Sequence, residues 1–141
     1  MRIIVEGNPV AKKRPRFARR GKFVATYNPQ KKEEGSFLAR AKGQIGRKMA
    51  GPLRVDCWFY IPRPKSHYGR GRNSGRLLIT APKHIMGKFD VDNLLKHCLD
   101  ALNGYAWDDD GQIIALTGIK AYADDGQPRT EIEVMEIASE F

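Results

Sequence analysis

Apolar and polar residues alternate most regularly over residues 53–61. Every second position there is apolar, at Leu53, Val55, Cys57, Phe59 and Ile61. Because successive side chains of a strand point to opposite faces, this spacing predicts a strand with one buried face. Weaker patterns of the same kind predict strands at residues 3–5, 113–122 and 130–137. Residues 124–128 read Asp-Asp-Gly-Gln-Pro, which predicts a turn between the last two strands.

Two other segments carry apolar residues at helical spacing. In the first, an apolar face at Leu95, Cys98, Leu99 and Leu102 precedes Asn103-Gly104, where Gly favours a helix end. In the second, a helix is expected to begin at Asn28-Pro29 and to run to about residue 49. If the strands at 53–61 and 113–122 are parallel, the helix after Asp90 could connect them as a right-handed crossover.

The 141 residues suit one domain, residues 1–141, with a single core. The elements predict an α+β fold, with a mixed sheet of four or more strands and two helices. The N-terminus shows no secretory signal, and no stretch approaches the ~20 apolar residues that cross a bilayer. Cys57 and Cys98 fall on apolar faces and are expected to be buried, reduced thiols. These features together predict a cytoplasmic protein.

Basic residues gather in two segments between the predicted elements. Residues 10–27 are expected to form a basic hairpin arm, with strands at Arg14–Ala18 and Lys22–Tyr27 and a tip at 19–21. Residues 63–83 are expected to form a mobile basic loop, because they are rich in Pro, Gly, Ser, Arg and Lys. The residues expected to contact DNA phosphates are Lys12, Lys13, Arg14, Arg16, Arg19, Arg20, Arg70, Arg72 and Arg76. A merely solvated surface is the alternative.

Charge is unevenly distributed along the chain. Residues 1–88 hold 22 Lys and Arg against 4 Asp and Glu, a balance of +18, and residues 89–141 hold 3 against 12, a balance of −9. These sum to the net +9. A basic region that contacts a polyanion, followed by an acidic region that holds a metal ion, would account for this segregation. No helix combines the basic face, apolar face and aromatic anchors of a membrane-surface helix.

Two groups of carboxylates flank the helix that is predicted after Asp90. Asp90 and Asp92 stand at its start, and Asp108, Asp109 and Asp110 follow its end. Crowded carboxylates repel one another unless a cation or protons neutralise them, and Mg2+ prefers carboxylate oxygens and water. Caps and turns are an alternative use of these Asp residues. Lys96 could likewise form only a helical ion pair with Asp92.

The same stretch resembles the RusA-type Holliday-junction resolvases. The resemblance rests on Asp90-x-Asp92-Asn93-Leu94-x-Lys96, Asp100-Ala101-Leu102-Asn103 and Asp109-Asp110-x-Gln112. Weaker similarity covers Gly7-x-Pro9, the run 13–17 and Tyr27-x-Pro29. The resemblance implies catalytic residues at Asp90, Asp92, Asp110 and Lys96, with the three aspartates binding Mg2+, for which Mn2+ can substitute. It also implies a homodimer that acts on branched DNA.

We therefore expect a Mg2+-dependent endonuclease that resolves four-way DNA junctions by paired symmetric nicks in recombination and repair. One alternative is a broader nuclease that cuts flaps and other branches. Another is a junction-binding module whose Asp residues only form caps and turns. A protein-binding adaptor would leave the basic two thirds of the chain without a role.

Overall fold

The computed structural model of the chain describes residues 1–13 and 16–138. Four strands form a mixed sheet in the order β1-β6-β4-β5: β1 (Arg2–Glu6), β4 (Leu53–Ile61), β5 (Ile113–Tyr122) and β6 (Arg129–Glu136). β6 is antiparallel to both β1 and β4, whereas β4 and β5 are parallel. The predicted α+β fold with a mixed sheet is confirmed. The final strand begins and ends one residue earlier than expected.

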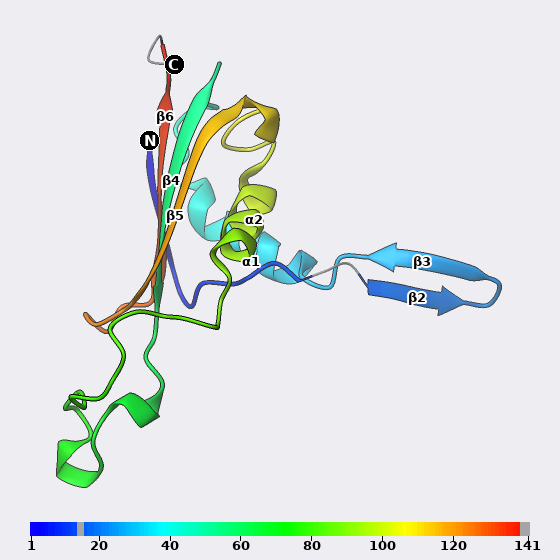
Figure 1. Cartoon of the computed structure of the whole chain (residues 1–141). Coiled ribbons are helices and arrows are strands. Elements are labelled where there is room, and N and C mark those ends of the chain that lie inside the picture. Colours follow the sequence, from blue (N-terminus) through cyan, green and yellow to red (C-terminus); the bar gives the residue numbers. More distant parts are fainter. Residues whose placement is uncertain (14–15, 139–141) are drawn as a thin grey trace.

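Helices α1 (Lys31–Lys42) and α2 (Val91–Leu102) lie beside the sheet, as Figure 1 shows. The apolar positions of β4 are all buried beneath them, and the core continues through Leu94, Cys98 and Leu102 of α2. Cys57 and Cys98 are both buried and free, as predicted. Because α2 follows β4 and precedes its parallel partner β5, it is the connection between them. None of the described helices has the length and apolar character needed to cross a bilayer.

The predicted helix at residues 28–49 was wrong at both ends. It begins after Gln30 and ends at Lys42, with Gly43 as its C-terminal cap. Asn28 precedes it and accepts a bond from the Gln30 amide. Beyond Gly43, tertiary contacts replace helical ones: the Gln44 side chain bonds both backbone groups of Ile4, and the Met49 amide bonds Ala106. The apolar residues continue at helical spacing to Met49, but these tertiary contacts hold residues 44–49 in a non-helical conformation.

The basic arm is a two-stranded hairpin that projects away from the body (Figure 1). Its strands are β2 (Arg16–Arg20) and β3 (Phe23–Tyr27), which pair antiparallel with Arg20 opposite Phe23. The prediction of a hairpin is confirmed, but its first strand lies two residues later than expected. The tip is therefore Gly21-Lys22, where Gly21 has a φ of +62° that suits glycine.

The basic loop at residues 63–83 contains local structure. Two short 3-10 helices lie at Lys65–His67 and Gly71–Asn73. Backbone hydrogen bonds join Gly69 to Arg76 and Leu78 to His67. The base of the loop is held by Arg63, whose side chain is only 3% exposed and bonds the Asp124 carboxylate and the Pro82 carbonyl. The Arg63 guanidinium also lies 4.1 Å from the centre of the Tyr122 ring.

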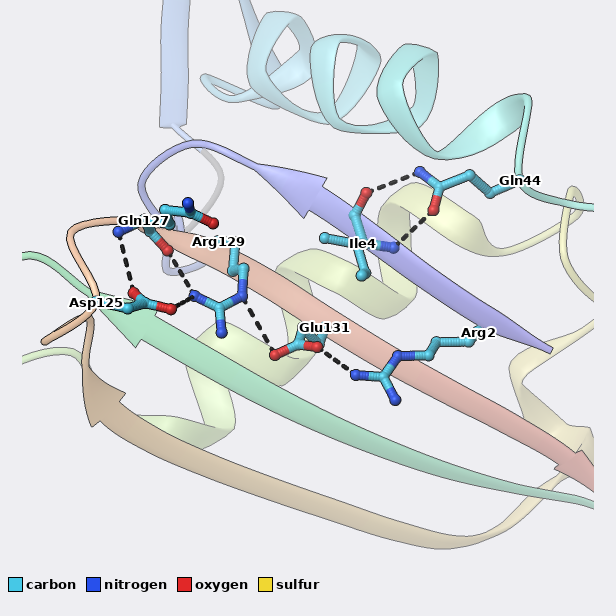
Figure 2. Close-up of polar contacts among 7 residues, drawn as sticks. All are labelled: Arg2, Ile4, Gln44, Asp125, Gln127, Arg129 and Glu131. Carbon is cyan, nitrogen blue, oxygen red and sulfur yellow. Dashed lines mark hydrogen bonds and ion pairs between the residues drawn. The ribbon is translucent and has the colours of Figure 1, made fainter.

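Part of the charge that is segregated along the sequence is paired in space. Figure 2 shows one such array, in which Arg2 and Arg129 both bond Glu131 and Arg129 also bonds Asp125. Ion pairs that join the basic first 88 residues to the acidic remainder are Arg2–Glu131, Lys12–Asp100, Arg47–Glu136, Lys48–Asp108 and Arg63–Asp124. Among the side chains that the structure describes, none forms an ion pair with Asp92 or Asp110.

Candidate active site

A shallow hollow lies between α2 and the start of β5. It has a volume of about 320 Å3 and is lined by Asp92, Leu95, Lys96, Leu99, Asp100, Asp110 and Leu116. Asp92, Lys96 and Asp100 share one face of α2 because each is four residues from the next. Leu95 packs against the core, and a Cβ on Gly118 would lie only 2.7 Å from its Cδ1, so the glycine lets α2 lie close against β5. The fold thereby brings carboxylates from both sequence clusters to one surface.

Asp110 is fixed by a contact with the core. Its Oδ1 accepts a hydrogen bond of 2.7 Å from Nε1 of Trp107, which is fully buried. Burial raises the pKa of Asp110 above its ordinary value; the Trp107 bond opposes this rise, and the nearby negative charges of Asp100 and Asp109 add to it. A positive ion in the hollow would relieve this crowding, since it favours the charged carboxylate.

Asp100 is held by a lysine from the root of the arm. The Lys12 ammonium lies 3.0 Å from Asp100 and also bonds Glu34 of α1, and its side chain is 13% exposed. Burial alone would lower the Lys12 pKa, but the bonds to Glu34 and Asp100 outweigh it and raise that pKa. The Lys12 amide donates to the Asn93 carbonyl of α2 at 2.8 Å. Lys12 thus fastens the arm to both helices.

The other Asp residues have different surroundings. Asp90 is the N-terminal residue preceding α2, but its side chain makes no capping hydrogen bond and does not line the hollow. Asp92 accepts a bond from the Asn93 amide at 2.9 Å. Asp109 caps a short 3-10 helix (Asp110–Gln112) in a reciprocal arrangement with Gln112. Asp108 is exposed and pairs with Lys48. Asp108 and Asp109 therefore have structural roles, whereas the carboxylate of Asp90 has none in the described residues.

The donor atoms in the hollow suit a hard divalent cation, although the arrangement is open. No group of three His, Cys, Asp or Glu side chains within the described part of the chain is close enough to hold a metal ion. Asp92 and Asp100 are eight residues apart on α2, about 12 Å at 1.5 Å per residue. Mg2+ commonly takes one or two carboxylates and completes its shell with water and substrate phosphate oxygens. The hollow fits this mode of binding better than a closed cage of protein ligands.

The predicted DNA-contacting residues fall into three groups. Lys12 differs from the expectation, because its ammonium is already paired and largely buried. Lys13, Arg19, Arg70, Arg72 and Arg76 are exposed. Arg16 and Arg20 lie on β2, and Arg14 lies outside the described residues. The arm and the basic loop extend from the body in different directions (Figure 1).

Sequence reasoning missed two residues of the hollow. Asp100 is not among the predicted site residues, although its spacing from Asp92 and Lys96 places it on their helix face. Trp107 orients Asp110 through a hydrogen bond that no local pattern signals. The four-residue spacing could have identified Asp100, whereas Trp107 required the folded structure.

An open acidic hollow on a basic chain is the arrangement expected of an enzyme that cleaves nucleic-acid phosphodiesters. Comparison with known proteins identifies the class: the chain belongs to the family described as Endodeoxyribonuclease RusA, whose model matches residues 6–135. The chain is also 32% identical over 145 residues to "Uncharacterized protein YqaN" of Bacillus subtilis (strain 168), a match that covers 99% of this chain and 98% of that relative. The resemblance drawn from the sequence is thereby confirmed at the level of the family.

Proposed function

We propose that the protein is a Mg2+-dependent endonuclease that resolves four-way DNA junctions by paired, symmetric nicks. The observation that carries this proposal is the hollow in which Asp92, Lys96 and Asp110 come together, in a chain of the RusA endodeoxyribonuclease family. Its proposed setting is DNA recombination and repair in the cytoplasm. Branched DNA is the proposed substrate, with linear duplex a poor one.

The proposed chemistry assigns a separate task to each residue. Asp92 and Asp110 would hold the cation, with Asp90 joining from the start of α2. When bound, Mg2+ or Mn2+ activates water and stabilises charge on the phosphate and the leaving oxygen. Trp107 keeps the Asp110 carboxylate directed by its hydrogen bond. Lys96, from the same hollow, would either stabilise negative charge on the phosphate or help to transfer a proton.

Affinity for DNA would come from the exposed basic side chains of the arm and loop. Lys13 and Arg19 on the arm and Arg70, Arg72 and Arg76 on the loop are all exposed to solvent. Cations of this kind contact phosphates and position the duplex without reading its sequence. A homodimer would carry two such hollows related by a two-fold axis, as paired incision of opposed strands requires.

The decisive experiment compares cleavage of four-way, flap and linear DNA with Mg2+ or Ca2+. Mg2+-dependent paired nicking of the four-way junction, with little cutting of the others, is the expected result. Equal cutting of flaps would indicate a broader branch nuclease. Tight junction binding without cleavage would indicate a binding module. Asp92→Asn is expected to abolish cleavage but to retain binding, because it removes a charge that holds the cation.

A further inference from the structure

An exposed apolar segment leads directly into the candidate active site. Its members are each at least 41% exposed and run from the second half of the basic loop to the start of α2: Leu77, Leu78, Ile79, Met86 and Phe89. Single exposed apolar side chains are ordinary on a protein surface, so exposure by itself assigns none of these residues a role. The segment also carries Lys83 and Lys88, so its apolar character lies within a positive environment.

Phe89, at the end of this segment, has an unusual backbone conformation. Its φ is +56°, and among the described residues it is the only one other than glycine with a positive φ. That region is unfavourable for a bulky L-residue and easier for Gly or Asn. Phe89 is 42% exposed, so packing in the core does not explain why an aromatic residue stands there. Conformations of this kind gather at functional sites, where the surrounding structure imposes them.

The chain around Phe89 is fixed on both sides. Ile85 is buried in the core, and α2 begins two residues after Phe89. Between them, Lys120 of β5 donates from Nζ to the Lys88 carbonyl at 2.7 Å. Gly87 has a φ of +77°, which lets the chain turn before that contact. These contacts hold the backbone on both sides of Phe89, which remains partly exposed to solvent.

Phe89 is also close to the carboxylates that are proposed to hold the cation. It precedes Asp92 by three residues, which limits the separation of their Cα atoms to about 11 Å. Successive bases on one DNA strand rise by about 3.4 Å. A phosphate at Asp92 would therefore place bases within about three steps of the Phe89 ring.

We infer that Phe89 stacks against a nucleobase that has left the base stack at the branch point, beside the strand to be cut. This inference rests on the proposed function. Aromatic side chains stack on the face of any base, and the interaction requires no particular sequence. Bases at a branch leave their stack at lower cost than paired bases within a duplex. The contact therefore favours branched DNA over linear duplex.

The test compares three variants of the full chain, with Ca2+ replacing Mg2+ and a four-way junction carrying 2-aminopurine at the branch point. Wild-type protein is expected to raise the 2-aminopurine fluorescence at least about twofold, because the base leaves its neighbours. Asn at position 89 tolerates the left-handed backbone but lacks a ring. The Phe89→Asn variant is therefore expected to show no rise in fluorescence and to bind the junction about tenfold more weakly. Its affinity for linear duplex is expected to stay within about twofold. Phe89→Tyr keeps the ring and is expected to behave as wild type.

Ile79→Asn is the matched control, because Ile79 is fully exposed in the same segment and receives the same substitution. It is expected to leave both the fluorescence and the affinity unchanged. A Phe89→Asn protein that keeps the fluorescence rise and the junction affinity would overturn the inference. Equal losses of affinity for junction and linear DNA would also overturn it. A dimer that dissociates only in the Phe89→Asn variant would overturn it as well, because Phe89 would then contact a second copy of the chain. The Ca2+ experiment measures binding without cleavage, so the two proposals can fail separately. If the wild-type protein raises the 2-aminopurine fluorescence but does not cut the junction with Mg2+, the proposed function is rejected and the role of Phe89 is not.

Discussion

The indole Nε1 of Trp107 donates a 2.7 Å hydrogen bond to Oδ1 of Asp110. Trp107 is completely buried, so this bond joins the core of the domain to the wall of the acidic hollow. One Asp110 oxygen is thus held by the protein, and the other is available to a ligand. The relationship distinguishes Asp110 from its two acidic neighbours in the sequence.

We predict a ranking of cleavage rates among the three adjacent aspartates. Asp110→Asn is expected to lower the single-turnover rate at least ~100-fold, comparable to the loss of a large electrostatic contribution. Asp108→Asn is expected to stay within a few-fold of wild type, because Asp108 is exposed and pairs only with Lys48. Asp109→Asn is expected to fall between them, since it weakens a cap. An inactive Asp108→Asn beside an active Asp110→Asn would contradict the proposed assignment of the second cluster.

The charge of Asp100 is predicted to contribute to the raised pKa of Asp110. Burial is the largest cause of the raised Asp110 pKa, and the negative charge of Asp100 raises that pKa further. Asp100→Asn is therefore expected to lower the Asp110 pKa, and Lys12→Met, which leaves Asp100 unpaired, is expected to raise it. NMR titration of the Asp110 carboxyl in metal-free protein measures both shifts. Movement of the two variants in the same direction would contradict this electrostatic coupling.

The basic arm is predicted to control the salt dependence of DNA binding. Replacing Arg14 and Arg16 with Ala is expected to weaken binding to every DNA. It is also expected to flatten the plot of log affinity against log salt, by about one unit for each phosphate that the arm no longer neutralises. Arg2→Ala is the control, since Arg2 is a surface arginine that pairs with Glu131 away from the arm. An unchanged slope in the double variant would show that the arm is only solvated.

Arg63 is predicted to hold the basic loop against the body. Arg63→Ala removes its bonds to Asp124 and Pro82 and its stacking on Tyr122, and is expected to lower the free energy of unfolding by about 2 kcal/mol. Urea unfolding measures that loss, and limited trypsin digestion within residues 63–83 is expected to accelerate. Arg72→Ala, at an exposed loop position, is expected to change stability by less than about 0.5 kcal/mol. Equal effects of the two substitutions would contradict the role of Arg63.

The sequence by itself determined the elements whose signal is local. The strict alternation at β4, the apolar stripe of α2 and the glycine after it predicted those elements closely, because each residue's face follows from helix or strand geometry. The same local signals placed Asp92 and Lys96 on one side of α2. The motif around them was specific enough to indicate the family that the comparisons confirm.

Only the tertiary structure decided which distant groups meet. α1 ends at Lys42 because Gln44 bonds the backbone of Ile4, a contact across 40 residues. Lys12 looked like a phosphate contact in the sequence, but its ammonium pairs with Glu34 and Asp100 from two helices. Asp110 differs from Asp108 through the buried indole of Trp107. Periodicity records which face a residue occupies, whereas hydrogen bonds and ion pairs depend on what the folded chain places opposite that face.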